Sequence, residues 1–260
     1  MDSTTFKYYH VHEFDSKCYL DAFLSPNTNK QLQEEAIWRP MKYMHKELVS
    51  GHVKGYNLID ITVGPSICHL FPVCEFFKEI TILEFNRFCV AELDKWLSND
   101  KEAFDWSHAS KFMMDLEGKS GGWKEKEELL RGKIKSILKC DITKDNPTDP
   151  VELPKADCII CMWVLDVIST DKDAYISNLR KISSLLKPGG RLMLVSDINA
   201  TFYIVGEHKY GVLTYDEEFL KTALKNEGYI IETYEAHDRK VCLDYIDYEK
   251  LAFLTALKPE

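Results

Sequence analysis

Asn57-Leu-Ile-Asp-Ile-Thr-Val-Gly-Pro65 is the stretch of sequence that decides the fold of this chain. Its apolar part, 57–63, has the length and composition of a buried strand, and Gly64-Pro65 turns the chain. Because proline suits the first turn of a helix, we expect a helix from Pro65 to about Phe77. A strand, a glycine turn and a helix in this order predict the first unit of a parallel sheet.

Strand-length apolar runs and helical patterns continue to alternate along the chain. Further strands are expected at 79–85, 135–142, 156–162 and 191–195, with a closing antiparallel pair at 229–234 and 251–256. Helices are expected at 86–97, 171–186 and 215–227. This order predicts an α/β fold with a mostly parallel, seven-stranded sheet and right-handed crossovers. The closing pair, a C-terminal antiparallel hairpin, is typical of the Rossmann-like class I methyltransferase fold.

The length of 260 residues suits one large domain, 1–260. Two additions to the sheet are expected, one before the core, 55–260, and one within it. The first is an N-terminal helical lid, 1–54, with a helical segment at 32–48. The second is a charged insert, 115–133, expected to form a solvated helix.

Composition restricts the classes of partner. Hydrophobic residues make up 45% of the chain and the formal charge is −9. An acidic surface repels nucleic acid and anionic membranes, and no apolar run is long enough to span a membrane, so neither partner is expected. The charge is compatible with a cationic amine. The N-terminal segment has no secretory signal pattern, so we expect a cytoplasmic protein. A monomer is the default expectation.

The eight cysteines are expected to be reduced thiols rather than disulfides or metal ligands. Cys158 and Cys161 form a C-x-x-C pattern inside a predicted buried strand. Residues three apart on a strand point to opposite faces, so the pair cannot easily share a metal ion. No second pattern completes a zinc site, and no metal is expected.

Candidate site residues lie where the predicted strands end, because ligands of open parallel sheets bind beyond the carboxyl ends of the strands. In chain order these residues are Asp60 to Gly64, Glu84 with Phe85, Asp141 with Ile142, Met162 to Asp166, and Ser196 with Asp197. Two of the acids fit S-adenosylmethionine: Glu84 can accept hydrogen bonds from the ribose hydroxyls, and Asp141 can accept one from the adenine amino group. Phe85 can pack on the adenine. For each acid alone, a helix cap or an exposed loop charge is the better interpretation, whereas two acids at successive strand ends beside a glycine turn favour a nucleotide-like ligand.

Several segments resemble one known family. They include Leu58-Ile-Asp-Ile-Thr-Val-Gly-Pro-Ser66, Ala103-Phe-Asp-Trp-Ser107, Leu138-Lys-Cys-Asp141, Leu185-Leu-Lys-Pro-Gly-Gly190 and Tyr203-Ile-Val-Gly-Glu207. Over 14–258 the chain is similar to the amine N-methyltransferases that act on nicotinamide, indolethylamine and phenylethanolamine. The resemblance implies a methyl transfer from S-adenosylmethionine, with S-adenosylhomocysteine as product, to a small-molecule amine.

The resemblance also implies roles for individual residues. Tyr19 would lie over the donor as part of the N-terminal lid. The other implied donor-binding residues are Asp60, Thr62, Gly64, Glu84, Phe85, Cys89, Asp141, Ile142 and Met162. The acceptor would face Asp166, Asp197 and Tyr203, with Asp244 or Asp247 as further candidate carboxylates and Trp163, Phe202 and Tyr245 as candidate aromatic walls.

Departures from the family pattern cluster near these positions. Thr62 and Val63 replace small residues of the donor loop, and Leu24, Cys68 and Cys89 replace polar donor contacts. Ser196, Ala200 and Val212 depart from the nicotinamide-specific pattern, which favours an indolethylamine-like or other aromatic amine over nicotinamide. Two functions stay open at this point: an active amine N-methyltransferase, and a catalytically degenerate relative that binds a small molecule or has a structural role.

Overall fold

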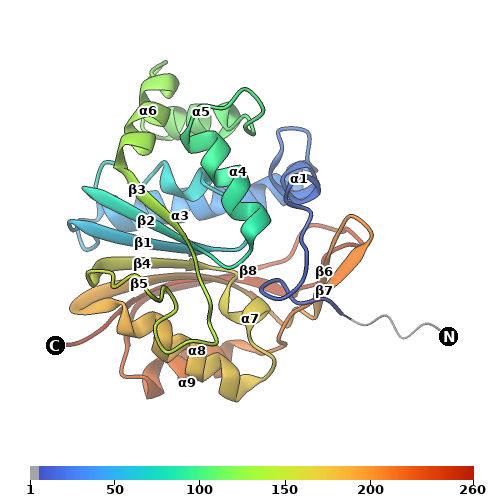
Figure 1. Ribbon diagram of the computed structural model, residues 1–260, viewed down its shortest axis with the longest axis vertical. Helices are drawn as coiled ribbons and strands as arrows, with labels where there is room; N and C mark the ends of the chain where they lie inside the picture. The colour runs from blue at the N-terminus through green and yellow to red at the C-terminus, as the bar shows by residue number, and fades with distance from the viewer. Residues whose placement is uncertain (1–5) are drawn as a thin grey trace.

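The computed structural model describes residues 6–260, which fold around one seven-stranded sheet (Figure 1). The strand order is β3-β2-β1-β4-β5-β9-β8. Strands β1 to β5 are parallel, and β9 pairs antiparallel with both β5 and β8. The strand bounds are β1 Asn57–Thr62, β2 Glu79–Glu84, β3 Ile134–Lys139, β4 Ala156–Met162, β5 Leu186–Ile198, β8 Ile230–Asp238 and β9 Lys250–Leu257. The predicted fold class is confirmed.

Helices cover both faces of this sheet (Figure 1). One layer contains α4 (Arg87–Leu97), α5 (Ser107–Leu116) and α6 (Trp123–Lys133). The other contains α7 (Leu165–Ile168), α8 (Lys172–Ser184) and α9 (Glu217–Asn226). Asn86 caps α4 as predicted, since its side chain accepts a hydrogen bond from the Phe88 amide. Within residues 6–260, no helix is long and apolar enough to cross a membrane.

The N-terminal segment is mostly helical. Its elements are α1 (Ser16–Tyr19), η1 (Leu20–Leu24), α2 (Lys30–Gln33), η2 (Glu34–Trp38) and α3 (Arg39–Val49). The helical segment predicted at 32–48 is therefore confirmed and is slightly longer. Segments η1 and η2 are π-helical turns, which are frequent at functional sites. Residues 1–5 of the predicted lid lie outside the described part of the chain.

The helix predicted from Pro65 to Phe77 is wrong. Only a short 3-10 helix, η3 (Cys68–Leu70), forms there, followed by turns. Pro72 explains the difference, because it lacks the amide hydrogen that a continuing helix would need at that position. The consequence is important for the site, since the irregular backbone brings His69 back to the end of β1.

The structure differs from the sequence-based expectations at three other places. Strand β3 ends at Lys139, so Asp141 lies in the loop after the strand rather than at its end. A two-stranded hairpin, β6 (Phe202–Val205) with β7 (His208–Gly211), was not predicted. The charged insert is not a fully solvated helix, because Lys126 of α6 is buried, with its Nζ 2.8 Å from Glu75 Oε1.

Candidate active site

A cavity of about 750 Å³, open mouth included, lies beside the ends of β4 and β5. Its walls come from η1, η2, the loop after β1, α7, the β6–β7 hairpin and the segment before β9, and they are mostly apolar and aromatic. Of the predicted site residues, it brings together Tyr19, Asp166, Asp197 and Tyr203.

Asp166 and Asp197 supply the carboxyl groups predicted for the acceptor. Asp166 is buried in α7, and its Oδ1 has no hydrogen-bond partner among residues 6–260. Burial raises the pKa of Asp166 to about 7. Asp197 accepts a hydrogen bond of 3.0 Å from Trp163 Nε1. Burial and the nearby charge of Asp166 hold the pKa of Asp197 well above its usual range. Because their pKa values are raised, both carboxyl groups accept a proton more readily than an ordinary aspartate does.

Trp163 is held in an unusual conformation at this wall. Its φ of 55° lies in the left-handed region, which is uncommon for a residue other than glycine. The amide of Trp163 donates to the Val195 carbonyl at 2.9 Å, and the indole reaches Asp197. Such strain at a cavity wall indicates a functional constraint, here the orientation of the Asp197 carboxylate.

Tyr203 faces the cavity from β6. Its hydroxyl is buried without a hydrogen-bond partner in the described chain, and its ring stacks on Tyr210 at a centroid distance of 5.2 Å. Phe202 lines the cavity as predicted, whereas Tyr245 packs edge-on against Phe23 at 5.4 Å.

Sequence reasoning missed Glu35. This buried carboxylate of η2 lines the cavity and accepts hydrogen bonds from the Lys240 amide, at 2.8 Å, and from the Tyr248 hydroxyl. No local pattern distinguishes it from the other acids of this helical segment. The predicted alternatives Asp244 and Asp247 do not line the cavity: Asp244 is exposed, and Asp247 accepts from the amides of Thr201 and Phe202 at 2.8 Å each.

The end of β1 holds a buried polar cluster around Asp60. Its Oδ1 lies 2.7 Å from His69 Nε2 and accepts a hydrogen bond of 2.9 Å from the Thr62 hydroxyl. Burial alone would lower the pKa of His69, but the Asp60 carboxylate raises it to about 9. The contact with Asp60 therefore favours the protonated form of His69. Sequence analysis missed it because the region was expected to be helical.

Glu84, at the end of β2, contacts a residue far away in the sequence. Its Oε1 accepts hydrogen bonds of 2.7 Å from the Tyr9 hydroxyl and from the Asn86 amide. Burial raises the pKa of Glu84 to about 8, although these hydrogen bonds oppose the rise. The Tyr9 oxygen also accepts a hydrogen bond of 2.8 Å from the Gly64 amide and lies 3.3 Å from Cys89 Sγ. Three predicted donor-binding residues thus meet at one tyrosine hydroxyl.

Tyr19 lies against the glycine of the donor loop. Its hydroxyl donates to the Val63 carbonyl at 3.3 Å. Gly64 has a φ of +76°, and a Cβ there would lie 2.8 Å from Cδ1 of the Tyr19 ring. Only glycine allows this approach. The remaining predicted donor-binding residues near these strand ends, Phe85, Ile142 and Met162, are buried.

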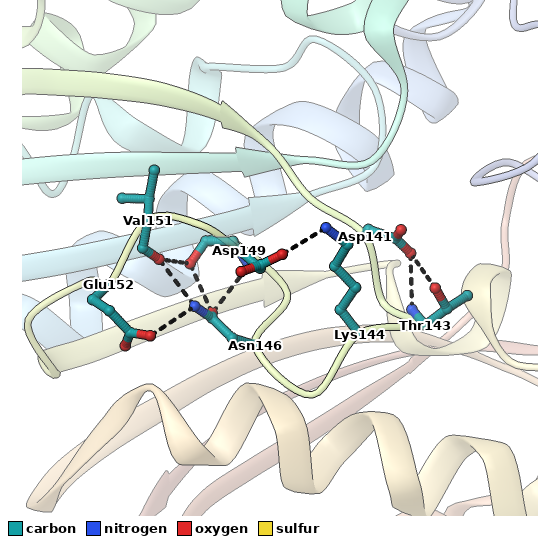
Figure 2. Close-up of polar contacts among 8 residues, drawn as sticks. Asp141, Thr143, Lys144, Asn146, Asp149, Val151 and Glu152 are labelled. Carbon is teal, nitrogen blue, oxygen red and sulfur yellow. Dashed lines mark hydrogen bonds and ion pairs between the residues drawn. The ribbon is translucent and has the colours of Figure 1, made fainter.

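Asp141 does not join the buried cluster. Its exposed carboxylate accepts hydrogen bonds from the Thr143 amide, at 3.0 Å, and hydroxyl, at 2.6 Å, as Figure 2 shows. These hydrogen bonds lower the pKa of Asp141. In the same loop Lys144 pairs with Asp149 at 2.8 Å (Figure 2). Asp141 therefore stabilises its own turn in this structure.

Comparison with known proteins agrees with this geometry. The chain is 35% identical over 249 residues to human nicotinamide N-methyltransferase, covering 96% of this chain and 94% of that protein. It is 37% identical over 214 residues to indolethylamine N-methyltransferase of Oryctolagus cuniculus, covering 82% and 81%. The N-methyltransferase NodS of Bradyrhizobium japonicum, solved with S-adenosyl-L-homocysteine, shares the fold, with a TM-score of 0.56 at 13% identity over 94% of this chain and 98% of that one. A family profile matches residues 3–259, and the chain belongs to the NNMT/PNMT/TEMT family.

Proposed function

We propose that this protein is an S-adenosylmethionine-dependent N-methyltransferase that acts on a small aromatic amine. The observation that carries the proposal is the Asp166 carboxyl, buried in an aromatic cavity with one oxygen free of hydrogen bonds within residues 6–260. A buried, unsatisfied carboxylate costs free energy that a bound ammonium group would recover. Family membership supports the reaction class.

The donor-binding residues fit S-adenosylmethionine. Glu84 Oε2 is buried without a hydrogen-bond partner among residues 6–260, as suits a carboxylate that receives a ribose hydroxyl. The positive φ of Gly64 and its missing side chain allow the Tyr19 ring to lie against the donor loop, which suits a lid over the donor. When bound, S-adenosylmethionine supplies a methyl group on a positively charged sulfur. No group of His, Cys, Asp or Glu in the described chain could hold a metal ion.

The residues of the cavity would position the amine and take up its proton. Asp166, with a pKa of about 7, can accept a proton from an ammonium group at neutral pH, which leaves the nitrogen lone pair free to attack. Asp197, oriented by Trp163, would hold the nitrogen in place. The aromatic walls exclude water and hold the acceptor close to the methyl group, and such proximity supplies roughly 7–11 kcal/mol of the barrier reduction in well-oriented reactions.

Two features favour an aromatic alkylamine over nicotinamide. Nicotinamide carries no positive charge that could pair with Asp166 when that group is ionised. Leu24, Ala200 and Val212 line the cavity with apolar atoms, where an aromatic ring is better accommodated than a carboxamide. The cytoplasmic location and monomeric state remain predictions.

Titration calorimetry with S-adenosylmethionine, followed by a methyl-transfer assay with indolethylamines, phenylethylamines and pyridines, tests this function. We expect donor binding and methylation of an arylalkylamine. Asp166→Asn should lower kcat/KM for that amine by at least about 100-fold, whereas Asp244→Asn, at an exposed position off the cavity, should not change it. Absence of donor binding at millimolar concentration would instead favour the degenerate relative.

A further inference from the structure

Residues 6–14 cross the predicted donor site, and Tyr9 is their fully buried centre. The Tyr9 hydroxyl donates to Glu84 Oε1 and accepts from the Gly64 amide, at 2.7 and 2.8 Å. It also lies 3.3 Å from Cys89 Sγ. The Tyr9 hydroxyl therefore contacts polar groups of three elements, namely β2, the loop after β1, and α4.

The chemistry of this contact matches that of a sugar hydroxyl. A ribose hydroxyl would donate to the same carboxylate and could accept from the same backbone amide. Glu84 Oε1 already accepts hydrogen bonds from Tyr9 and from the Asn86 amide, and both come from the protein. A nucleoside hydroxyl bound at Glu84 Oε1 and the Gly64 amide would therefore compete with Tyr9, whereas Glu84 Oε2 has no partner among residues 6–260.

Outside this site the segment has few backbone hydrogen bonds, and its main side-chain contact is the buried Phe14, which packs on Tyr19 and Tyr210 at centroid distances of 5.3 Å each. Asn86 Nδ2 donates to the Tyr9 and His12 carbonyls at 3.1 Å each. At the N-terminal side, the Lys7 amide donates to the Lys209 carbonyl at 2.9 Å, and the Gly211 amide donates to the Lys7 carbonyl at 3.0 Å. Between residues 6 and 14 there is no helix and no paired strand beyond the single bridge at Lys7. A segment with so few backbone hydrogen bonds can open without unfolding the sheet.

We propose that residues 6–14 are an intramolecular competitor of the methyl donor, with the Tyr9 hydroxyl in the place of a ribose hydroxyl. The proposal rests on the proposed function, since it assumes that the donor binds at Glu84 and Gly64. The apparent affinity for the donor is then the intrinsic affinity reduced by the fraction of molecules in which the segment has opened.

The first test is donor affinity measured by calorimetry on the full chain. Tyr9→Phe keeps the ring but removes the hydroxyl, so the closed form loses its hydrogen bond to Glu84, and S-adenosylmethionine should bind about 10-fold more tightly. Tyr8→Phe is the matched control, because Tyr8 stacks on His12 outside this contact, and its affinity should equal that of the wild type. Thermal unfolding checks that both variants fold.

The second test uses hydrogen exchange of the wild-type protein. Addition of S-adenosylmethionine should speed exchange at the Lys7 and Gly211 amides, because their hydrogen bonds join the segment to the β6–β7 hairpin and break when the segment opens. The competitor proposal is overturned if Tyr9→Phe and the wild type bind the donor equally well, or if exchange at these amides becomes slower. Neither result contradicts the proposed function. Slower exchange would mean that the segment closes over the donor. If neither protein binds the donor, the proposed function and the competitor both fail.

Discussion

The buried ion pair of His69 and Asp60 gives the sharpest test of the structure, and the test does not depend on any activity. His69 is fully buried and Asp60 is 1% exposed, so water cannot stabilise either charge. His69→Gln removes the cation but keeps a side chain that can donate to the carboxylate. Asp60 then remains as a buried charge with no opposite charge beside it, which is the more costly way to break such a pair.

The size of the effect follows from the pKa of His69. The pKa rises from 6.5 to about 9, and each pKa unit corresponds to about 1.36 kcal/mol. The pair therefore stabilises the folded protein by about 3 kcal/mol relative to a neutral imidazole. Because the pKa is raised on folding, this contribution is complete below pH 6.5 and is lost as the pH rises through about 9.

Urea unfolding of wild type and His69→Gln between pH 6 and pH 9.5 measures this contribution. The variant should be about 3 kcal/mol less stable at pH 6 and should approach the wild type above pH 9. Lys42→Gln is the control, since its pair with Glu34 is exposed and should contribute less than about 1 kcal/mol. A difference between wild type and His69→Gln that does not vary with pH would refute the assignment of His69 as a buried cation.

Three further predictions concern the cavity and the donor loop. Gly64→Ala should destabilise the protein by more than about 2 kcal/mol, because a side chain there is both strained and blocked, whereas Gly118→Ala, with a similar φ but open space, should cost only about 1 kcal/mol in urea unfolding. In the wild type, kcat/KM for the amine should rise with pH through about 7 as Asp166 ionises, and Asp166→Asn should abolish this rise. Trp163→Phe removes the hydrogen bond to Asp197 and should lower kcat/KM at pH 7 about 10-fold, with partial recovery at higher pH.

The sheet could be predicted from the sequence because its signals are local. Each parallel strand is an apolar run between turn residues, and the run 57–63 with Gly64-Pro65 places the first crossover. The β6–β7 hairpin was missed because its strands are only four residues long and join at Gly206 without strong alternation. The helix after Pro65 was predicted wrongly because the effect of Pro72 was not taken into account.

The candidate site was only partly predictable, for a different reason. The ends of β1, β2 and β4 follow from the topology, so Asp60, Glu84 and Met162 were placed near one edge. The partners of these residues could not be derived. Tyr9 reaches Glu84 across 75 positions of sequence, and such a contact leaves no periodic or spacing signal.

Two of the residues that depart from the family pattern, Thr62 and Cys89, make contacts with other residues of this chain. Thr62, whose branched side chain is unexpected in a donor loop, donates its hydroxyl to Asp60 and lies 3.2 Å from His69 Nε2, so it completes a buried cluster. Cys89 lies against the Tyr9 hydroxyl, where a larger polar side chain would compete for that oxygen. These replacements pair with residues of this chain, while Asp60 Oδ2, His69 Nδ1 and Glu84 Oε2 have no hydrogen-bond partner among residues 6–260. In the proposed donor site, the loop that departs from the family pattern therefore contacts Tyr9 and the Asp60–His69 pair of this chain.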